Sequence, residues 1–124
     1  MAEELKIANG GKQQRYDLLY RQVVTLVEGD ELVLGPFQGP LACSRIAYGK
    51  GVCGTAWQRE QSVVVEDVEL FPGHIACSSL SRSEIVVPVK DGGRVVAVLD
   101  IDSTEVGTCD DVDREWLERI VAHL

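Results

Sequence analysis

Apolar residues recur at helical spacing toward both ends of the chain. One such stretch runs over residues 11–28, with apolar positions at Tyr16, Leu19, Tyr20, Val23 and Val27. The other closes the chain, with apolar positions at Val112, Trp116, Leu117, Ile120, Val121 and Leu124. A spacing of three and four residues places side chains on one face of a helix. The pattern therefore predicts a helix over 11–28 and a second one after Asp110 or Asp111, either of which could cap it.

Between these two stretches the chain is divided into short runs rich in β-branched residues. The runs are ELVLGPF, LACSRIAY, SVVVEDV, SEIVVPVK and GRVVAVLDID, and glycine and proline separate them. Such runs are typical of strands. Asp91-Gly92-Gly93 joins the last two runs as a hairpin, whereas GVCGTAWQRE predicts one short helix. We therefore expect an α+β fold in which helices flank an antiparallel sheet.

The composition is that of a globular protein in water. Hydrophobic residues make up 45% of the 124-residue chain and charged residues 26%, and the longest apolar runs are too short to cross a membrane. A chain of this length holds one core, so we expect a single domain over residues 1–124. Its opening, MAEELK, lacks the basic patch and apolar stretch of a secretory signal. This predicts a reducing, cytoplasmic compartment.

Acidic side chains outnumber basic ones along the chain. With 20 Asp and Glu against 12 Lys and Arg, the formal net charge is −8. Nucleic acids and anionic membranes carry negative charge of their own and would be repelled. We therefore expect neither as a partner, and instead expect a small metabolite or another protein.

The cysteines allow three interpretations. They stand at Cys43, Cys53, Cys77 and Cys109. Any one of them could be a buried, small hydrophobic residue. A zinc site with His74 is a second interpretation, but no C-x-x-C pair is present. Redox chemistry is the third, because Cys77 lies in a polar loop between His74 and Arg82, and either cation would favour the thiolate.

Three longer stretches carry a family resemblance. LVLGPFQGPLACSRIAYGKGVCGTAW, VEDVELFPGHIACSSLSRSEIVVPV and VLDIDS, within residues 31–124, resemble the free methionine-(R)-sulfoxide reductases, a branch of the GAF-domain fold. The resemblance implies an enzyme that reduces the sulfoxide of the free amino acid with thiols, without a metal, flavin or other cofactor. It also implies thioredoxin as the reductant.

The resemblance assigns roles to three of the cysteines. Cys77, in HIAC, resembles the attacking thiol, which ends as a sulfenic acid when methionine leaves. Cys43, in LAC, resembles the resolving partner and implies a Cys43–Cys77 disulfide that thioredoxin reduces. Cys53, in GVCG, matches a third family cysteine, and it is either an auxiliary thiol with a pKa lowered by the helix start or a structural residue in a tight turn. Cys109 matches no family cysteine.

The same resemblance points to an acidic cluster. Glu84 in SEIVVP, with Asp100 and Asp102 in LDID, matches the family's carboxylates. Asp100 and Asp102 alternate along a strand and so share one sheet face, where an adjacent strand can bring Glu84 to them. One crowded carboxyl group could stay protonated as a general acid while another binds the substrate's ammonium group. Ser81 and Ser83 are interpreted as residues that shape the loop.

The chain also departs from the family pattern. Members usually carry a further helix and an aromatic strand, N-W-x-G-F-Y, before the LVLGPF motif, whereas here Val27-Glu28-Gly29-Asp30 leads directly into Glu31. Ser78 also follows Cys77 where the family often has Asp. Loss of a strand exposes backbone groups and apolar side chains, which predicts a homodimer whose partner covers the opening between Asp30 and Glu31. The alternative function is a GAF-type ligand-binding or redox-sensing module without turnover.

Overall fold

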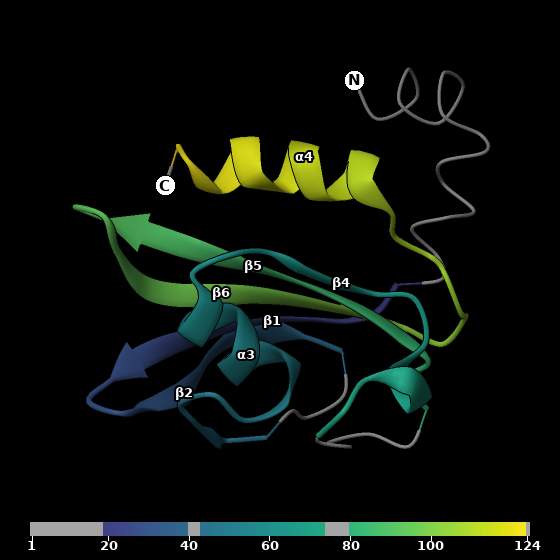
Figure 1. Cartoon of the computed structure of the whole chain (residues 1–124), viewed down its shortest axis with the longest axis horizontal. Helices are drawn as coiled ribbons and strands as arrows, with labels where there is room; N and C mark the ends of the chain where they lie inside the picture. The colour runs from purple at the N-terminus through teal and green to yellow at the C-terminus, as the bar shows by residue number, and fades with distance from the viewer. Residues whose placement is uncertain (1–18, 40–42, 74–79, 124) are drawn as a thin grey trace.

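The computed structural model describes residues 19–39, 43–73 and 80–123. Within them lies a six-stranded antiparallel sheet with the strand order β3-β2-β1-β6-β5-β4 (Figure 1). The strands are β1 (Leu19–Glu28), β2 (Glu31–Gln38), β3 (Arg45–Ala47), β4 (Val63–Val65), β5 (Ser83–Asp91) and β6 (Arg94–Ser103). The helical elements are α3 (Gly51–Arg59), the short 3₁₀ helix η1 (Val68–Leu70) and α4 (Asp111–Val121). The predicted α+β fold is confirmed.

The first predicted helix is wrong over its described part, because residues 19–28 form strand β1. This strand lies between β2 and β6 and pairs with both. Its buried side chains, Val23 and Thr25, alternate with more exposed ones, as the period of a strand requires. Gly29 and Asp30 form the turn of a hairpin in which Glu28 pairs with Glu31. The predicted opening between Asp30 and Glu31 is therefore wrong as well, because a tight turn closes the sheet there.

Most of the other predicted elements are confirmed. Strands β2, β5 and β6 and helix α3 form where the sequence predicted them. Asp91 pairs with Arg94 across the predicted hairpin, whose Gly92 and Gly93 have φ of +61° and +80°, values that glycine adopts readily. The remaining two runs form only the three-residue strands β3 and β4 at the sheet edges. Short edges leave few backbone groups open to pairing with another chain.

The two helices cover opposite faces of the sheet (Figure 1). On the α3 face, Val52 and Ala56 of the helix pack with Val86 of β5 and Val98 of β6. On the α4 face, the core consists of Ile85, Val87, Ile101 and Val121. Both faces of β5 are therefore buried, which explains its nearly continuous run of apolar residues.

Helix α4 begins where one of the two predicted caps places it. The Asp110 side chain accepts hydrogen bonds from the backbone N–H groups of Val112 and Asp113, and the Asp113 side chain accepts one from the backbone N–H of Asp110, which forms a capping box. Only part of the predicted apolar stripe faces the sheet, because Val112, Trp116 and Ile120 are each more than half exposed. Within the described residues, no helix is long and apolar enough to span a membrane.

Candidate functional site

Three carboxylates lie on the α3 face of the sheet, in the middle of the molecule. Glu84 of β5 stands directly opposite Asp102 of β6. Asp100 precedes Asp102 by two residues in β6 and lies on the same face. All three are buried, with 7%, 5% and 1% of their surface exposed for Glu84, Asp100 and Asp102. The structure therefore brings together the acidic side chains that the sequence predicted to meet. Burying charge is costly without partners, so such a grouping is typical of a binding or catalytic site.

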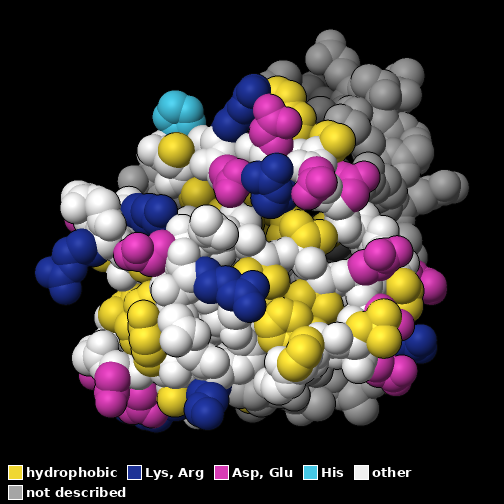
Figure 2. All heavy atoms as spheres, in the orientation of Figure 1, with side chains coloured by type: hydrophobic (Ala, Val, Ile, Leu, Met, Phe, Trp, Pro, Cys, Tyr) yellow, Lys and Arg dark blue, Asp and Glu magenta, His cyan; other side chains and the backbone are white. Residues whose placement is uncertain are grey.

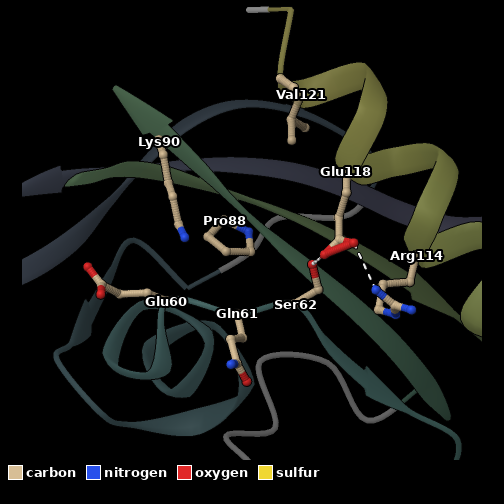
Figure 3. Close-up of a pocket in the computed structure, with 9 residues that line it drawn as sticks. Glu60, Gln61, Ser62, Pro88, Lys90, Arg114, Glu118 and Val121 are labelled. Carbon is tan, nitrogen blue, oxygen red and sulfur yellow. Dashed lines mark hydrogen bonds and ion pairs between the residues drawn. The ribbon is translucent and has the colours of Figure 1, made fainter. Parts of the chain in front are cut away.

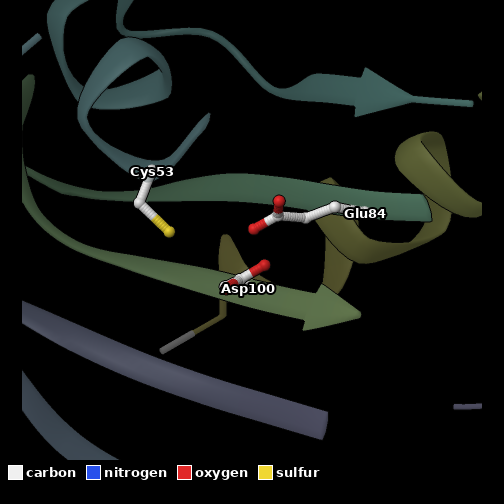
Figure 4. Close-up of side chains that lie close together, drawn as sticks. All are labelled: Cys53, Glu84 and Asp100. Carbon is white, nitrogen blue, oxygen red and sulfur yellow. The ribbon is translucent and has the colours of Figure 1, made fainter. Parts of the chain in front are cut away.

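Helix α3 adds a thiol to this face. Cys53 projects from its first turn, and its sulfur points toward the carboxyl groups of Glu84 and Asp100 (Figure 4). One ligand atom from each of the three residues lies within 4.8 Å of the others, which is close enough for them to hold one metal ion. Cys53 is buried, with 5% of its surface exposed. The sequence alone did not predict that this cysteine faces the acids.

The environment of Cys53 raises the pKa of its thiol well above the usual value. Burial is the main cause, because removal from water penalises the thiolate. The negative charges of Asp100, Glu84 and Asp102, and a hydrogen bond with Asp100, act in the same direction. Of the two interpretations left open for Cys53, the one with a pKa lowered by the helix start is therefore wrong, since burial and nearby acids outweigh the helix dipole. Cys53 is a protonated thiol at neutral pH.

Two serines near the start of β5 bond to different partners. The Ser81 hydroxyl donates to Oδ1 of Asp102 at 3.0 Å, and both residues are buried. The Ser83 hydroxyl instead donates to the backbone carbonyl of Glu105. The sequence treated the two residues alike, as loop-shaping serines. Ser81 precedes β5, which begins at Ser83, so the alternation that places Ser83 and Glu84 on opposite faces does not extend to Ser81.

The remaining predicted residues fall into two groups. Cys77 and His74 lie outside the described residues, as does Ser78. Cys43 is half-buried and disulfide-bonded, whereas Cys53 and Cys109 are not in disulfides. Cys109 packs against the core on the α4 face, on the other side of the sheet from the acids. That Cys109 takes no part in the chemistry stays a prediction.

A separate groove of about 710 Å³ opens between residues 60–62, which follow α3, strand β5 and helix α4 (Figure 3). Its lining includes Pro88 and Lys90 of β5 and Arg114 of α4. Glu118 accepts hydrogen bonds from Ser62 and from Arg114, both at 2.8 Å. Of the predicted site residues that the structure describes, none lines it. The groove is thus distinct from the acidic cluster.

The fold described above has counterparts among known proteins. A family model described as "GAF domain" matches residues 19–124. This chain belongs to the GAF domain family. "GAF domain-containing protein A" of Dictyostelium discoideum is 42% identical over 153 residues, which cover 98% of this chain and 97% of that protein. Because this alignment is longer than the 124-residue chain, some residues of the relative are aligned with gaps in this chain.

Within the GAF family, the chain is related to free methionine-R-sulfoxide reductases. The Escherichia coli reductase is 54% identical over 99 residues, and the Saccharomyces cerevisiae reductase is 48% identical over 94 residues. These matches cover 80% and 75% of this chain, but only 60% and 52% of the two reductases. This GAF domain protein therefore spans little more than half the length of these relatives.

Solved structures give the same relationship. The free methionine-R-sulfoxide reductase from Neisseria meningitidis, determined in complex with its substrate, is 50% identical with a TM-score of 0.82. The match covers 94% of this chain and 66% of that one. The reduced form of fRMsr of Staphylococcus aureus is 44% identical with a TM-score of 0.82, over 95% of this chain and 79% of that one. The sheet and helices thus retain the arrangement of these reductases.

Proposed function

We propose that this GAF domain protein reduces free L-methionine-(R)-sulfoxide to L-methionine with its own thiols. The observation that carries the proposal is the buried cluster of Glu84, Asp100 and Cys53, in a chain 54% identical to a free methionine-R-sulfoxide reductase. A hydrophobic core gains nothing from burying two carboxyl groups side by side. A polar ligand that brings its own cation and hydrogen-bond acceptor would satisfy both groups.

The thiol steps run in two stages. Cys77 attacks the sulfoxide sulfur, methionine leaves, and the oxygen remains on Cys77 as a sulfenic acid. The Cys43 thiol then attacks the sulfur of Cys77, which forms the Cys43–Cys77 disulfide and releases the oxygen as water. Support comes from Cys43, which is disulfide-bonded, whereas Cys53 and Cys109 are not in disulfides. Cys53 contributes as a protonated thiol beside the acids, since its raised pKa leaves little thiolate to attack a sulfenic acid.

The carboxyl groups serve the polar end of the substrate and the departing oxygen. Glu84 and Asp100 lie side by side on this face, and the pair donates the proton that the sulfoxide oxygen takes up. The negative charge of the cluster attracts the ammonium group of the free amino acid.

The proposal includes a reductant, a location and an assembly. Thioredoxin reduces the disulfide, and the protein works in the cytoplasm, where such a dithiol donor is available.

The protein acts as a homodimer through the exposed stripe Val112, Trp116 and Ile120 of α4. Acidic Asp111 and Asp113 flank the start of this helix and basic Arg119 lies in its last turn. Two copies packed antiparallel would therefore bring opposite charges together.

Turnover with defined thiol variants tests the proposal. The protein is incubated with free L-methionine-(R)-sulfoxide, thioredoxin, thioredoxin reductase and NADPH, and methionine is measured. We expect Cys77→Ser to release no methionine, because an alcohol is far less nucleophilic than a thiol. Cys43→Ser should release one equivalent without reductant and then stop. Cys109→Ser is the matched control and should turn over like the wild type, since Cys109 lies on the opposite face.

Two outcomes would count against the proposal. Methionine release from Cys77→Ser at the wild-type level would remove the nucleophile. Binding of the substrate by the wild type without any release would favour the alternative, a GAF-type ligand-binding module.

A further inference from the structure

The hydrogen bond between Ser81 and Asp102 links the residues just before β5 to the acidic cluster. The Ser81 hydroxyl donates to Oδ1 of Asp102 at 3.0 Å. Only 5% of Ser81 and 1% of Asp102 are exposed, so water competes little for this bond. In such surroundings a hydrogen bond to a charged group is worth more than one at the surface.

We propose that Ser81 is a positioning residue that acts through Asp102 to make the site select ligands with a free ammonium group. This inference rests on the proposed function. A buried carboxylate keeps its charge only where donors stabilise it, and the Ser81 hydroxyl is such a donor. Asp102 stands directly across from Glu84, so the charge on one affects the other.

Loss of this hydroxyl should lower the negative charge of the cluster. Without the Ser81 donor, the Asp102 carboxylate is held less firmly and is less stabilised as an anion. A cluster with less negative charge attracts an ammonium group less strongly. Its interaction with the uncharged parts of the ligand changes little. The variant should therefore lose affinity for the free amino acid and keep its affinity for an analogue that lacks the amino group.

Ser83 provides the matched control. It stands two residues from Ser81, is also buried, and donates its hydroxyl to the Glu105 backbone carbonyl. Ser83→Ala removes the same atom and a hydrogen bond of the same region without touching Asp102. A loss of affinity that is specific to Ser81→Ala therefore reports on the acidic cluster.

The test compares two substrates on these variants. They are free L-methionine-(R)-sulfoxide and 4-(methylsulfinyl)butanoate, which is the same molecule without the amino group. We expect Ser81→Ala to raise KM for the amino acid about tenfold, the loss typical of one hydrogen bond to a charged group, with little change in kcat. KM for the analogue should stay unchanged, Ser83→Ala should leave both values unchanged, and Ser81→Thr should restore the wild-type KM.

The possible failures can be told apart. An equal rise of KM for both substrates, or none, overturns the role of Ser81. Absence of turnover in the wild type counts against the proposed function, and the role of Ser81 is then decided by calorimetric binding of L-methionine against 4-(methylsulfanyl)butanoate. If circular dichroism shows that Ser81→Ala is unfolded, Ser81→Cys takes its place, because it preserves the volume and weakens the donor.

Discussion

Cys53 shares a buried face of the sheet with three carboxyl groups, and these neighbours decide how its thiol behaves. Isolated at the start of a helix, a cysteine would be expected to ionise readily. Here burial and nearby negative charge raise its pKa. Cys53 is therefore suited to donating a hydrogen bond to Asp100 and poorly suited to nucleophilic attack.

The raised pKa predicts how stability depends on pH. As pH rises above about 8.5, the usual pKa of a cysteine, the unfolded chain loses this proton before the folded protein does. The contribution of Cys53 is thus fully present below that pH and is lost as pH rises through the folded pKa. Between pH 7.5 and 10, wild type should lose stability more steeply than Cys53→Ala, by up to about 1.4 kcal/mol per pH unit.

Urea unfolding of the reduced protein at both pH values measures this effect. Cys109→Ala is the control, because Cys109 lies on the other face of the sheet, away from the acids. The comparison uses the difference between the two pH values, so the cavity left by either substitution cancels. The same pH dependence in wild type and Cys53→Ala would contradict the assignment of a raised pKa.

At the scale of elements, α3 places the thiol by packing closely on the loop before it. A Cβ atom added to Gly54 would lie 2.7 Å from the backbone oxygen of Ala47 and 3.2 Å from backbone atoms of Gly49. These are backbone contacts, which cannot rotate away. Gly54 therefore allows the close approach that holds Cys53 over the acids.

Gly54→Ala should destabilise the protein, although alanine normally stabilises a helix relative to glycine. We expect a loss of about 1–3 kcal/mol in the free energy of unfolding, the range for overpacked sites. Thermal or urea unfolding measures it, with Arg59→Ala, an exposed change in the last turn of the same helix, as the control. A gain in stability would show that helix propensity outweighs the close contact.

At the scale of the whole molecule, the surface combines charges of both signs with exposed apolar side chains. Acidic and basic side chains alternate over the region that α4 occupies (Figure 2). Among them, Trp116 is 57% exposed, with the guanidinium of Arg119 stacked 4.9 Å from its ring centre. A large aromatic side chain at the centre of an apolar stripe is typical of an interface anchor.

Trp116→Glu should therefore shift the proposed homodimer to monomers. Sedimentation velocity over a concentration series measures this, beside the activity of each sample. Glu115→Ala, a neighbouring change that leaves the apolar stripe intact, should sediment like the wild type. A wild-type protein that is monomeric and fully active at every concentration would rule out the α4 dimer.

The sequence by itself determined much of this architecture. Alternating and β-branched runs placed β2, β5 and β6, and Asp110 marked the start of α4, because these signals act between neighbouring residues. The alternation of Asp100 and Asp102 also predicted their shared face. Local geometry was sufficient for these features.

Only the tertiary structure decided the rest. Residues 19–28 satisfy a helical spacing as well as a strand spacing, and pairing with both β2 and β6 selects the strand. Cys53 lies among the acids because α3 packs over β5 and β6, a contact between residues more than 30 positions apart. Its raised pKa follows from that burial, so no local pattern could have predicted it.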